Sequence, residues 1–158
     1  MKRVDGNPDV SLLECTNPVK GLWRIRWDIQ ESETSATYME EQFSHKPTVE
    51  EIKDVVLAYY NDKIDDAILS GMTYEGAMVW LSAENQFNYK AAYDLAVQTN
   101  GQNLPVVFKF GTNDEPHYRT FETLEELRDF YVTAMSYVQT TLQEGWAKKD
   151  TFDVTLYE

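Results

Sequence analysis

The segment VWLSAENQFNYKAAYDLA, residues 79–96, changes from a strand pattern to a helix pattern within a few residues. Ser82 is a favourable N-cap because its hydroxyl can accept a hydrogen bond from a free backbone N–H of the first turn. Glu84 suits the positive end of the helix dipole. Apolar positions follow at helical spacing and predict a stripe that faces the core: Phe87, Ala91, Leu95, Ala92 and Ala96. We therefore predict a strand followed by an amphipathic helix.

A strand-then-helix pattern also precedes this segment. GLWRIRWDIQ, residues 21–30, alternates apolar and charged residues with the period of a half-buried strand, and ATYMEEQF, residues 36–43, continues extended after a polar turn. A helix is predicted next, since Thr48 and Glu51 have the spacing of a capping box and Gly71 is a natural stop. These features predict an antiparallel hairpin followed by a helix.

Two further hairpins are predicted downstream. MTYEGAMVWL, residues 72–81, has Glu75-Gly76 at its tip, where the glycine tolerates the positive φ of a tight turn. LPVVFKF and HYRTF flank a second turn, and Thr123 with Glu126 then begins a helix that is predicted to reach about Glu144. The predicted fold class is therefore α+β, with three antiparallel β-hairpins, each followed by an α-helix, and the helices packed on the sheet.

The same patterns divide the chain. Asp5-Gly6-Asn7-Pro8 and Asn17-Pro18 favour turns, so residues 1–20 are predicted to be an irregular N-terminal arm. Residues 21–158 are predicted to form a single α+β domain. Within this domain, 21–46 is an N-terminal strand pair and 47–146 is a core of helices and hairpins.

Composition restricts the function. The formal charge of −13 disfavours binding to nucleic acid and to anionic membranes, because both would repel the protein. No stretch approaches the roughly 20 apolar residues of a membrane span. The first residues, MKRVDGNPDV, have no apolar run behind them, so no secretory signal is expected, and Cys15 is the only cysteine. We expect a cytosolic protein without a disulfide.

Residue patterns for catalysis are weak. His45 and His117 lie far apart in sequence, and NDKIDD, residues 61–66, resembles a calcium loop but lacks its glycine and lies in the helix pattern. No nucleophile elbow, phosphate-binding loop or dinucleotide fingerprint occurs. We therefore predict a protein that is not an enzyme, with no catalytic residues, no metal and no cofactor.

Aromatic and amide side chains supply the candidates for partner contact. Trp23 and Trp27 share one predicted strand face, and Asn85, Tyr89 and Tyr93 lie on the predicted helix of the opening segment. Core packing for the tryptophans, and helix capping with surface exposure for the other three, are the alternatives. The last helix carries apolar residues on two sides, which a homo-oligomer would explain and a deeply buried helix in a monomer would explain as well.

VWLSAENQFNYKAAYDLA, followed by LPVVFKFG and a late F-x-T-L-E-E-L-x-x-F, resembles a family of unknown function encoded by tailed bacteriophages and by prophages of gut bacteria. Its genes often lie beside those for tail fibres and other virion proteins. The similarity spans about residues 47–146, and the strand pair with Trp23 and Trp27 stands where a long fibre shaft would be. The resemblance implies the cytoplasm of a bacterial host as location, with incorporation into the virion as a further option.

The leading hypothesis is a non-enzymatic phage or prophage protein that acts by protein–protein contact, as an accessory or assembly component of the tail or virion. Its partners would be virion proteins or further copies of itself. One alternative is an acidic inhibitor or DNA mimic acting on a host enzyme, for which carboxylates would cluster on one elongated face. Another alternative is a carbohydrate-binding accessory, which needs exposed tryptophans beside a groove lined with carboxylates.

Overall fold

The computed structural model describes all residues from 1 to 158, which form two compact units. Unit 1 contains Met1–Tyr59 and Thr151–Glu158, and unit 2 contains Tyr60–Asp150. Helix α1 (Val49–Ser70) therefore begins in unit 1 and ends in unit 2. The strand pair predicted over 21–46 and most of the core predicted over 47–146 lie in different units.

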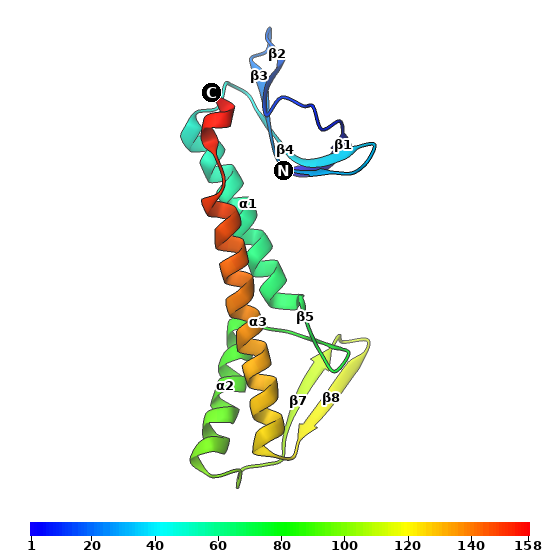
Figure 1. Ribbon diagram of the computed structural model, residues 1–158, viewed down its shortest axis with the longest axis vertical. Coiled ribbons are helices and arrows are strands. Elements are labelled where there is room, and N and C mark those ends of the chain that lie inside the picture. Colours follow the sequence, from blue (N-terminus) through cyan, green and yellow to red (C-terminus); the bar gives the residue numbers. More distant parts are fainter. The chain divides into compact units, whose positions relative to one another are not determined.

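Unit 1 contains a four-stranded antiparallel sheet in the order β1-β4-β3-β2 (Figure 1). Its strands are β1 (Lys2–Gly6), β2 (Leu13–Asn17), β3 (Leu22–Glu31) and β4 (Ala36–Phe43), and a 3-10 helix, η1 (Val154–Tyr157), lies near the C-terminus. The mixed α+β class is confirmed. Three antiparallel hairpins do precede the three α-helices, but the first is the central pair of a larger sheet, so the predicted arrangement of three hairpin-and-helix units is not confirmed.

Residues 1–20, expected to be an irregular arm, supply both edge strands of this sheet. Lys2 pairs with Glu40 of β4, and Leu13 pairs with Ile25 of β3. The turn residues that suggested irregularity lie between the strands, since Pro8 falls after β1 and Pro18 falls after β2. These turn residues mark the ends of β1 and β2. Backbone pairing with β4 and β3 makes the residues of β1 and β2 themselves extended.

One face of the sheet has the apolar character predicted for β3. Ile25 and Trp27 are buried, and the indole of Trp27 meets the ring of Tyr59 from α1 edge to face, with 5.7 Å between ring centroids. The predicted alternation ends after Trp27, because the pairing of β3 with β4 shifts there and Asp28 has a positive φ of 51°. Tyr59 donates a hydrogen bond of 2.7 Å to the carboxylate of Asp28.

The opposite face, which carries the charged residues of β3, contains a buried ion cluster. Arg26 and Glu40 are both buried, and Arg24 Nη1 lies 2.8 Å from Glu40 Oε2. Arg26 donates to Glu14 Oε2 at 2.6 Å and to the Ser11 carbonyl at 2.8 Å. These charges are buried because residues from the first twenty cover them, which the alternation of β3 alone does not reveal.

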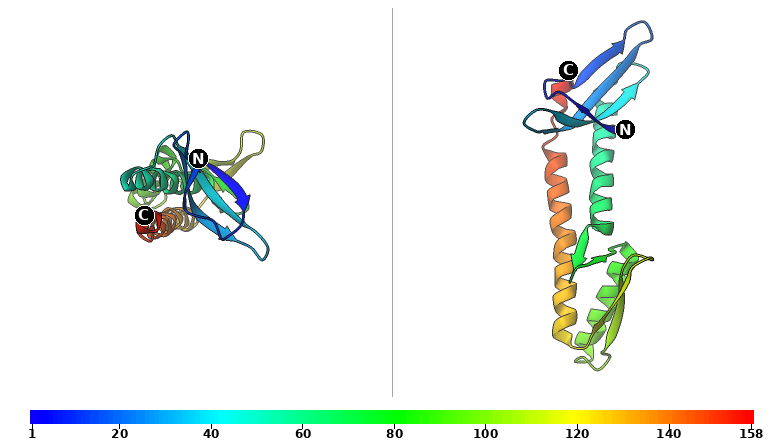
Figure 2. Two further views of the ribbon diagram at one scale, coloured as in Figure 1. Left: turned by 90° about the horizontal axis from the view of Figure 1, so that it is seen from above. Right: turned by 90° about the vertical axis from the view of Figure 1, so that its right-hand side faces the viewer.

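Unit 2 joins two short hairpins to three helical segments. Its remaining elements are β5 (Met72–Tyr74), β6 (Ala77–Val79), α2 (Ala83–Gln98), β7 (Val106–Gly111), β8 (Pro116–Phe121) and α3 (Leu124–Asp150). Both residues at the tip of the β5–β6 hairpin have positive φ, 49° at Glu75 and 82° at Gly76, as predicted for the tight turn. In Figure 1 and in the right-hand view of Figure 2, α2 and α3 lie side by side and run in opposite directions.

The helix starts follow the predicted caps. The Thr48 hydroxyl accepts a hydrogen bond from the Glu51 N–H at 3.2 Å, and the Glu51 carboxylate accepts one from the Thr48 N–H at 2.8 Å. Thr123 and Glu126 make the same reciprocal pair at the start of α3. Helix α3 runs to Asp150, beyond the predicted end near Glu144.

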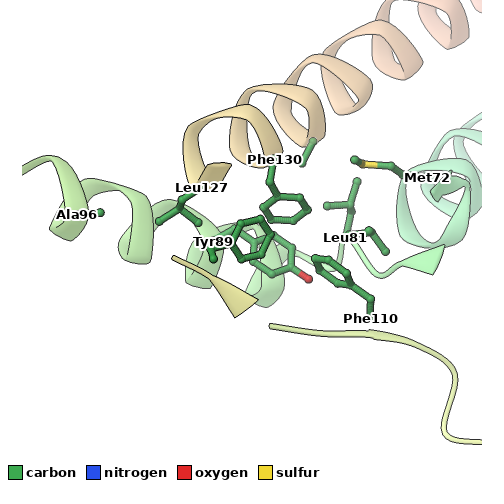
Figure 3. Close-up of a cluster of buried hydrophobic side chains, with 10 residues drawn as sticks. Met72, Leu81, Tyr89, Ala96, Phe110, Leu127 and Phe130 are labelled. Carbon is green, nitrogen blue, oxygen red and sulfur yellow. The ribbon is translucent and has the colours of Figure 1, made fainter. Parts of the chain in front are cut away.

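An aromatic cluster forms the centre of unit 2 (Figure 3). The ring of Phe130 on α3 lies 5.0 Å from that of Tyr89 on α2 and 5.1 Å from that of Phe110 on β7, measured between centroids. Phe108, Phe121 and Tyr74 complete the cluster at comparable distances. Both hairpins and both helices therefore depend on the same group of rings.

The remaining half of α3 packs against the end of α1. Tyr137 donates a hydrogen bond to the Ala67 carbonyl at 2.7 Å. Gly145 faces Ile64, and a Cβ at this glycine would lie 2.2 Å from Ile64 Cγ1. The helices approach closely here because position 145 has no side chain.

Helix α2 is rotated relative to the sequence prediction. Phe87 and Leu95, expected in the core, are exposed, whereas Tyr89 and Ala96 are buried. The positions that face the core have the three- and four-residue spacing of one helix face: Tyr89, Ala92, Tyr93 and Ala96. Phe87, Ala91 and Leu95 lie roughly 150° away around the helix axis. The prediction of the buried stripe was wrong, except for Ala92 and Ala96.

Two phenylalanines provide a matched test of this arrangement. Phe130→Ala should lower the free energy of unfolding by about 3–5 kcal/mol, because it leaves a cavity in the aromatic cluster. Phe87→Ala removes the same atoms from an exposed position and should change it by no more than about 0.5 kcal/mol. Urea unfolding followed by far-UV circular dichroism, at low protein concentration, measures both. Equal losses would mean that α2 does not present Phe87 to solvent.

Candidate functional site

The outer face of α2 exposes a row of apolar side chains. Phe87 is 69% exposed and Leu95 is 48% exposed, and the exposed Ala91 lies between them. The three positions are spaced by four residues, so their side chains form one continuous ridge along the helix. We call Phe87, Ala91 and Leu95 the α2 ridge. Contiguous apolar surface of this kind marks interaction sites more often than isolated exposed residues do.

Little charge surrounds the α2 ridge. Helix α2 contains two acidic residues, Glu84 and Asp94, and one basic residue, Lys90, a net charge of −1 in a chain of −13. Lys90 and Asp94 form an ion pair with each other. The ion pair raises the pKa of Lys90, chiefly through the hydrogen bond to Asp94. The exposed neighbours Asn88 and Gln98 are uncharged.

Of the contact candidates on α2, the two tyrosines belong to the packing of unit 2. Tyr89 is only 4% exposed, its ring centroid lies 4.7 Å from that of Phe108, and burial raises its pKa to about 12. Tyr93 stacks on Tyr131 of α3 with 4.8 Å between centroids. The side chain of Tyr89 does not reach the surface, and Tyr93 is partly covered.

Asn85 and Gln86 act at the start of α2. The Ser82 hydroxyl accepts a hydrogen bond from the Asn85 N–H at 3.2 Å, as the N-cap prediction requires. The side-chain amide of Asn85 donates to the Trp80 carbonyl at 2.9 Å, and that of Gln86 donates to the Leu81 carbonyl at 2.7 Å. These hydrogen bonds satisfy the carbonyl groups of residues directly before α2, which agrees with the capping interpretation of Asn85.

The two tryptophan candidates lie in unit 1. Trp27 is 2% exposed, whereas Trp23 is partly exposed and has Lys46 Nζ 5.6 Å from its ring centroid. Trp23 therefore remains accessible, and Trp27 belongs to the core. Of these two rings, only that of Trp23 can reach a ligand or partner from solvent.

A second surface feature of unit 2 is a shallow groove of about 720 Å³ between the β5–β6 hairpin, β8 and α3. Arg119 crosses it and donates to both carboxylate oxygens of Glu75, at 2.7 and 3.1 Å. Tyr74 donates to Asp129 at 2.9 Å. These polar groups bind one another and connect the hairpin to β8 and α3.

The charges in this groove shift the pKa values of their partners. The hydrogen bond from Arg119 lowers the pKa of Glu75 below its ordinary value. Burial raises the pKa of Tyr74 to about 12, and the hydrogen bond to Asp129 adds to the shift. Backbone hydrogen bonds from Glu122 and Thr123 lower the pKa of Glu126. At neutral pH the carboxylates of Glu75 and Glu126 are thus ionised and paired, which favours a structural role for the groove.

Both histidines sit beside carboxylates. His45 Nε2 lies 2.9 Å from Glu51 Oε1 of the first capping box in unit 1. In unit 2, His117 of β8 pairs with Phe110 of β7, and its imidazole contributes to the lowered pKa of Glu75. The contact of His45 with Glu51 supports the cap.

Residues 51–158 match a family described as a domain of unknown function, DUF4376. The chain belongs to this family. The match includes the whole of unit 2, with the α2 ridge and the groove crossed by Arg119, whereas the sheet of unit 1 precedes it. No curated protein matches the chain, and no solved structure matches it. None of the helices combines the length and apolar character needed to cross a membrane.

The ion pair between Glu75 and Arg119 should make the stability of unit 2 depend on pH. Because the folded pKa of Glu75 is lowered, its ion pair stabilises unit 2 above the ordinary carboxyl pKa and is lost as the pH falls through the folded value. Arg119→Gln should return the pKa of Glu75 to its ordinary value and reduce the pH dependence of the free energy of unfolding. Carboxyl carbon NMR titration measures this pKa directly.

Arg128→Gln serves as the control, because Arg128 lines the same groove but does not contact Glu75. It should leave the pKa of Glu75 unchanged. Equal upward shifts in both variants would show that the summed charge of the groove, and not the pair with Arg119, determines the pKa.

Proposed function

We propose that this protein functions by protein–protein contact in a phage or prophage, as an accessory or assembly component of the tail or virion, and that the α2 ridge is the contact surface. The observation that carries the contact function is the exposure of Phe87 and Leu95 on a helix whose other face is held in the core. The partners are other virion proteins or further copies of the chain.

The packing of unit 2 supports a preformed contact surface. Tyr89 and Tyr93 fix the rotation of α2 against Phe108 and Tyr131. The exposed ridge is therefore presented on a rigid helix, and binding requires little loss of backbone freedom. An aromatic side chain beside aliphatic ones on such a helix is the composition of helix-mediated interfaces.

The phage assignment is supported by sequence resemblance. Family membership over 51–158 overlaps the region 47–146, in which the sequence resembles proteins encoded near tail and virion genes. The α2 ridge and the aromatic cluster lie within both ranges. The chain's acidity agrees with a role in protein assembly and not in nucleic-acid packaging, since phosphates would repel it.

Mass spectrometry of purified particles tests the virion assignment. Particles induced from a strain that encodes the protein should contain it at a fixed ratio to the tail proteins. Phe87→Glu places a charge in the α2 ridge and should reduce incorporation or assembly by on the order of tenfold. Val132→Glu, at a similarly exposed valine on α3, is the matched control and should have little effect.

Two results would contradict this proposal. If the protein is absent from particles and its deletion leaves particle assembly unchanged, it is not a virion or assembly component. If Phe87→Glu and Val132→Glu behave alike, the α2 ridge is not the contact surface.

A further inference from the structure

We infer that the α2 ridge packs against the same ridge of a second copy of this chain, with the two α2 helices antiparallel and a two-fold axis near Ala91. This inference rests on the proposed function, because it uses the same surface and names its partner. It commits to self-association of α2 and predicts which residues meet.

The spacing of the ridge fits helix-on-helix packing. Phe87, Ala91 and Leu95 form a row at four-residue intervals, and two such rows pack side by side when helices cross at about 50°. With the rows antiparallel, Phe87 of one copy lies beside Leu95 of the other, at two equivalent places. The ring and the branched side chain thereby bury each other's exposed surface.

Ala91 occupies the middle of the row, at the crossing point. Its methyl group allows two helix axes to approach to about 8 Å, the short end of the usual range. A large residue there would separate Phe87 from the Leu95 of the other copy. Large residues at both ends and a small one at the centre make the row complementary to itself when one copy is reversed.

Charge selects the antiparallel orientation. In that arrangement Glu84 of one copy approaches the neutral Gln98 of the other, and the two Glu84 carboxylates are separated by about 14 residues of helix, or roughly 21 Å. This distance exceeds the Debye length of about 8 Å at physiological ionic strength. A parallel arrangement would bring Glu84 onto Glu84 and Asp94 onto Asp94. The outer face of α2 thus disfavours the parallel pair.

The remaining charge of the chain gives the dimer a distinctive dependence on salt. Each copy carries −13, so two copies repel one another at long range. Salt screens this repulsion and leaves the apolar contact in place. Self-association should therefore strengthen as salt rises, whereas contact with a basic partner would weaken. One helix face buries less area than a standard interface of about 1,600 Å², so the dimer is expected to be weak.

Sedimentation velocity of the full chain, over a range of protein and salt concentrations, tests the dimer. The wild-type chain should shift from monomer to dimer with rising concentration, at lower concentrations in higher salt. Phe87→Glu should weaken this association by on the order of tenfold or more, and Val132→Glu should not. Far-UV circular dichroism establishes that each variant keeps its helices.

Disulfide trapping tests the orientation. In a Cys15→Ser background, Ala91→Cys should form a covalent dimer under mild oxidation, because the two-fold axis brings position 91 close to itself. Glu84→Cys should not, because the two copies of position 84 then lie roughly 21 Å apart. Glu84→Cys that crosslinks to itself as readily as Ala91→Cys would indicate a parallel pair and overturn the antiparallel arrangement.

The outcomes separate this inference from the proposed function. A wild-type chain that stays monomeric throughout overturns self-pairing. If Phe87→Glu nevertheless prevents incorporation into particles, the ridge contacts a different virion protein and the proposed function stands. A dimer that persists unchanged in Phe87→Glu overturns the inference as well, because the copies then meet through another surface.

Discussion

The packing of aromatic rings around Phe130 is the constraint on which unit 2 depends. The ring of Phe130 meets rings from α2, β5, β7 and β8, so one side chain on α3 connects both hairpins to both helices. Tyr89 is the contribution of α2 to this cluster, and its position fixes the rotation of the helix. The exposure of Phe87 and Leu95 is the geometric consequence, since they lie on the other side of the same helix.

Local interactions made part of this fold predictable. The capping boxes that begin at Thr48 and Thr123, the N-cap Ser82 and the turn at Glu75-Gly76 were all correct, because each is satisfied by atoms within a few residues. Long-range pairing was not predictable in the same way. Segments of residues 1–20 form strands because they pair with the free edges of β4 and β3. No local sequence pattern indicates this long-range pairing.

The rotation of α2 shows why the face of a helix is harder to predict than its ends. Two sets of apolar side chains compete in residues 83–98, and the hydropathy of tyrosine is low although its ring packs well. The prediction that Phe87 and Leu95 lie in the core was therefore based on hydrophobicity alone. Tyr89 and Tyr93 face the core instead because their rings pack against Phe108 of β7 and Tyr131 of α3. Their three- and four-residue spacing with Ala92 and Ala96 was the available signal.

The central claim is that α2 buries its tyrosine face and exposes the row from Phe87 to Leu95. The most direct measurement is the rate of thiol labelling, at low protein concentration, of Phe87→Cys and Ala96→Cys in a Cys15→Ser background. Position 87 should react nearly as fast as a free thiol, and position 96, which is fully buried, should be strongly protected. Rapid labelling at 96 with protection at 87 would show that the helix faces the opposite way and would contradict the account.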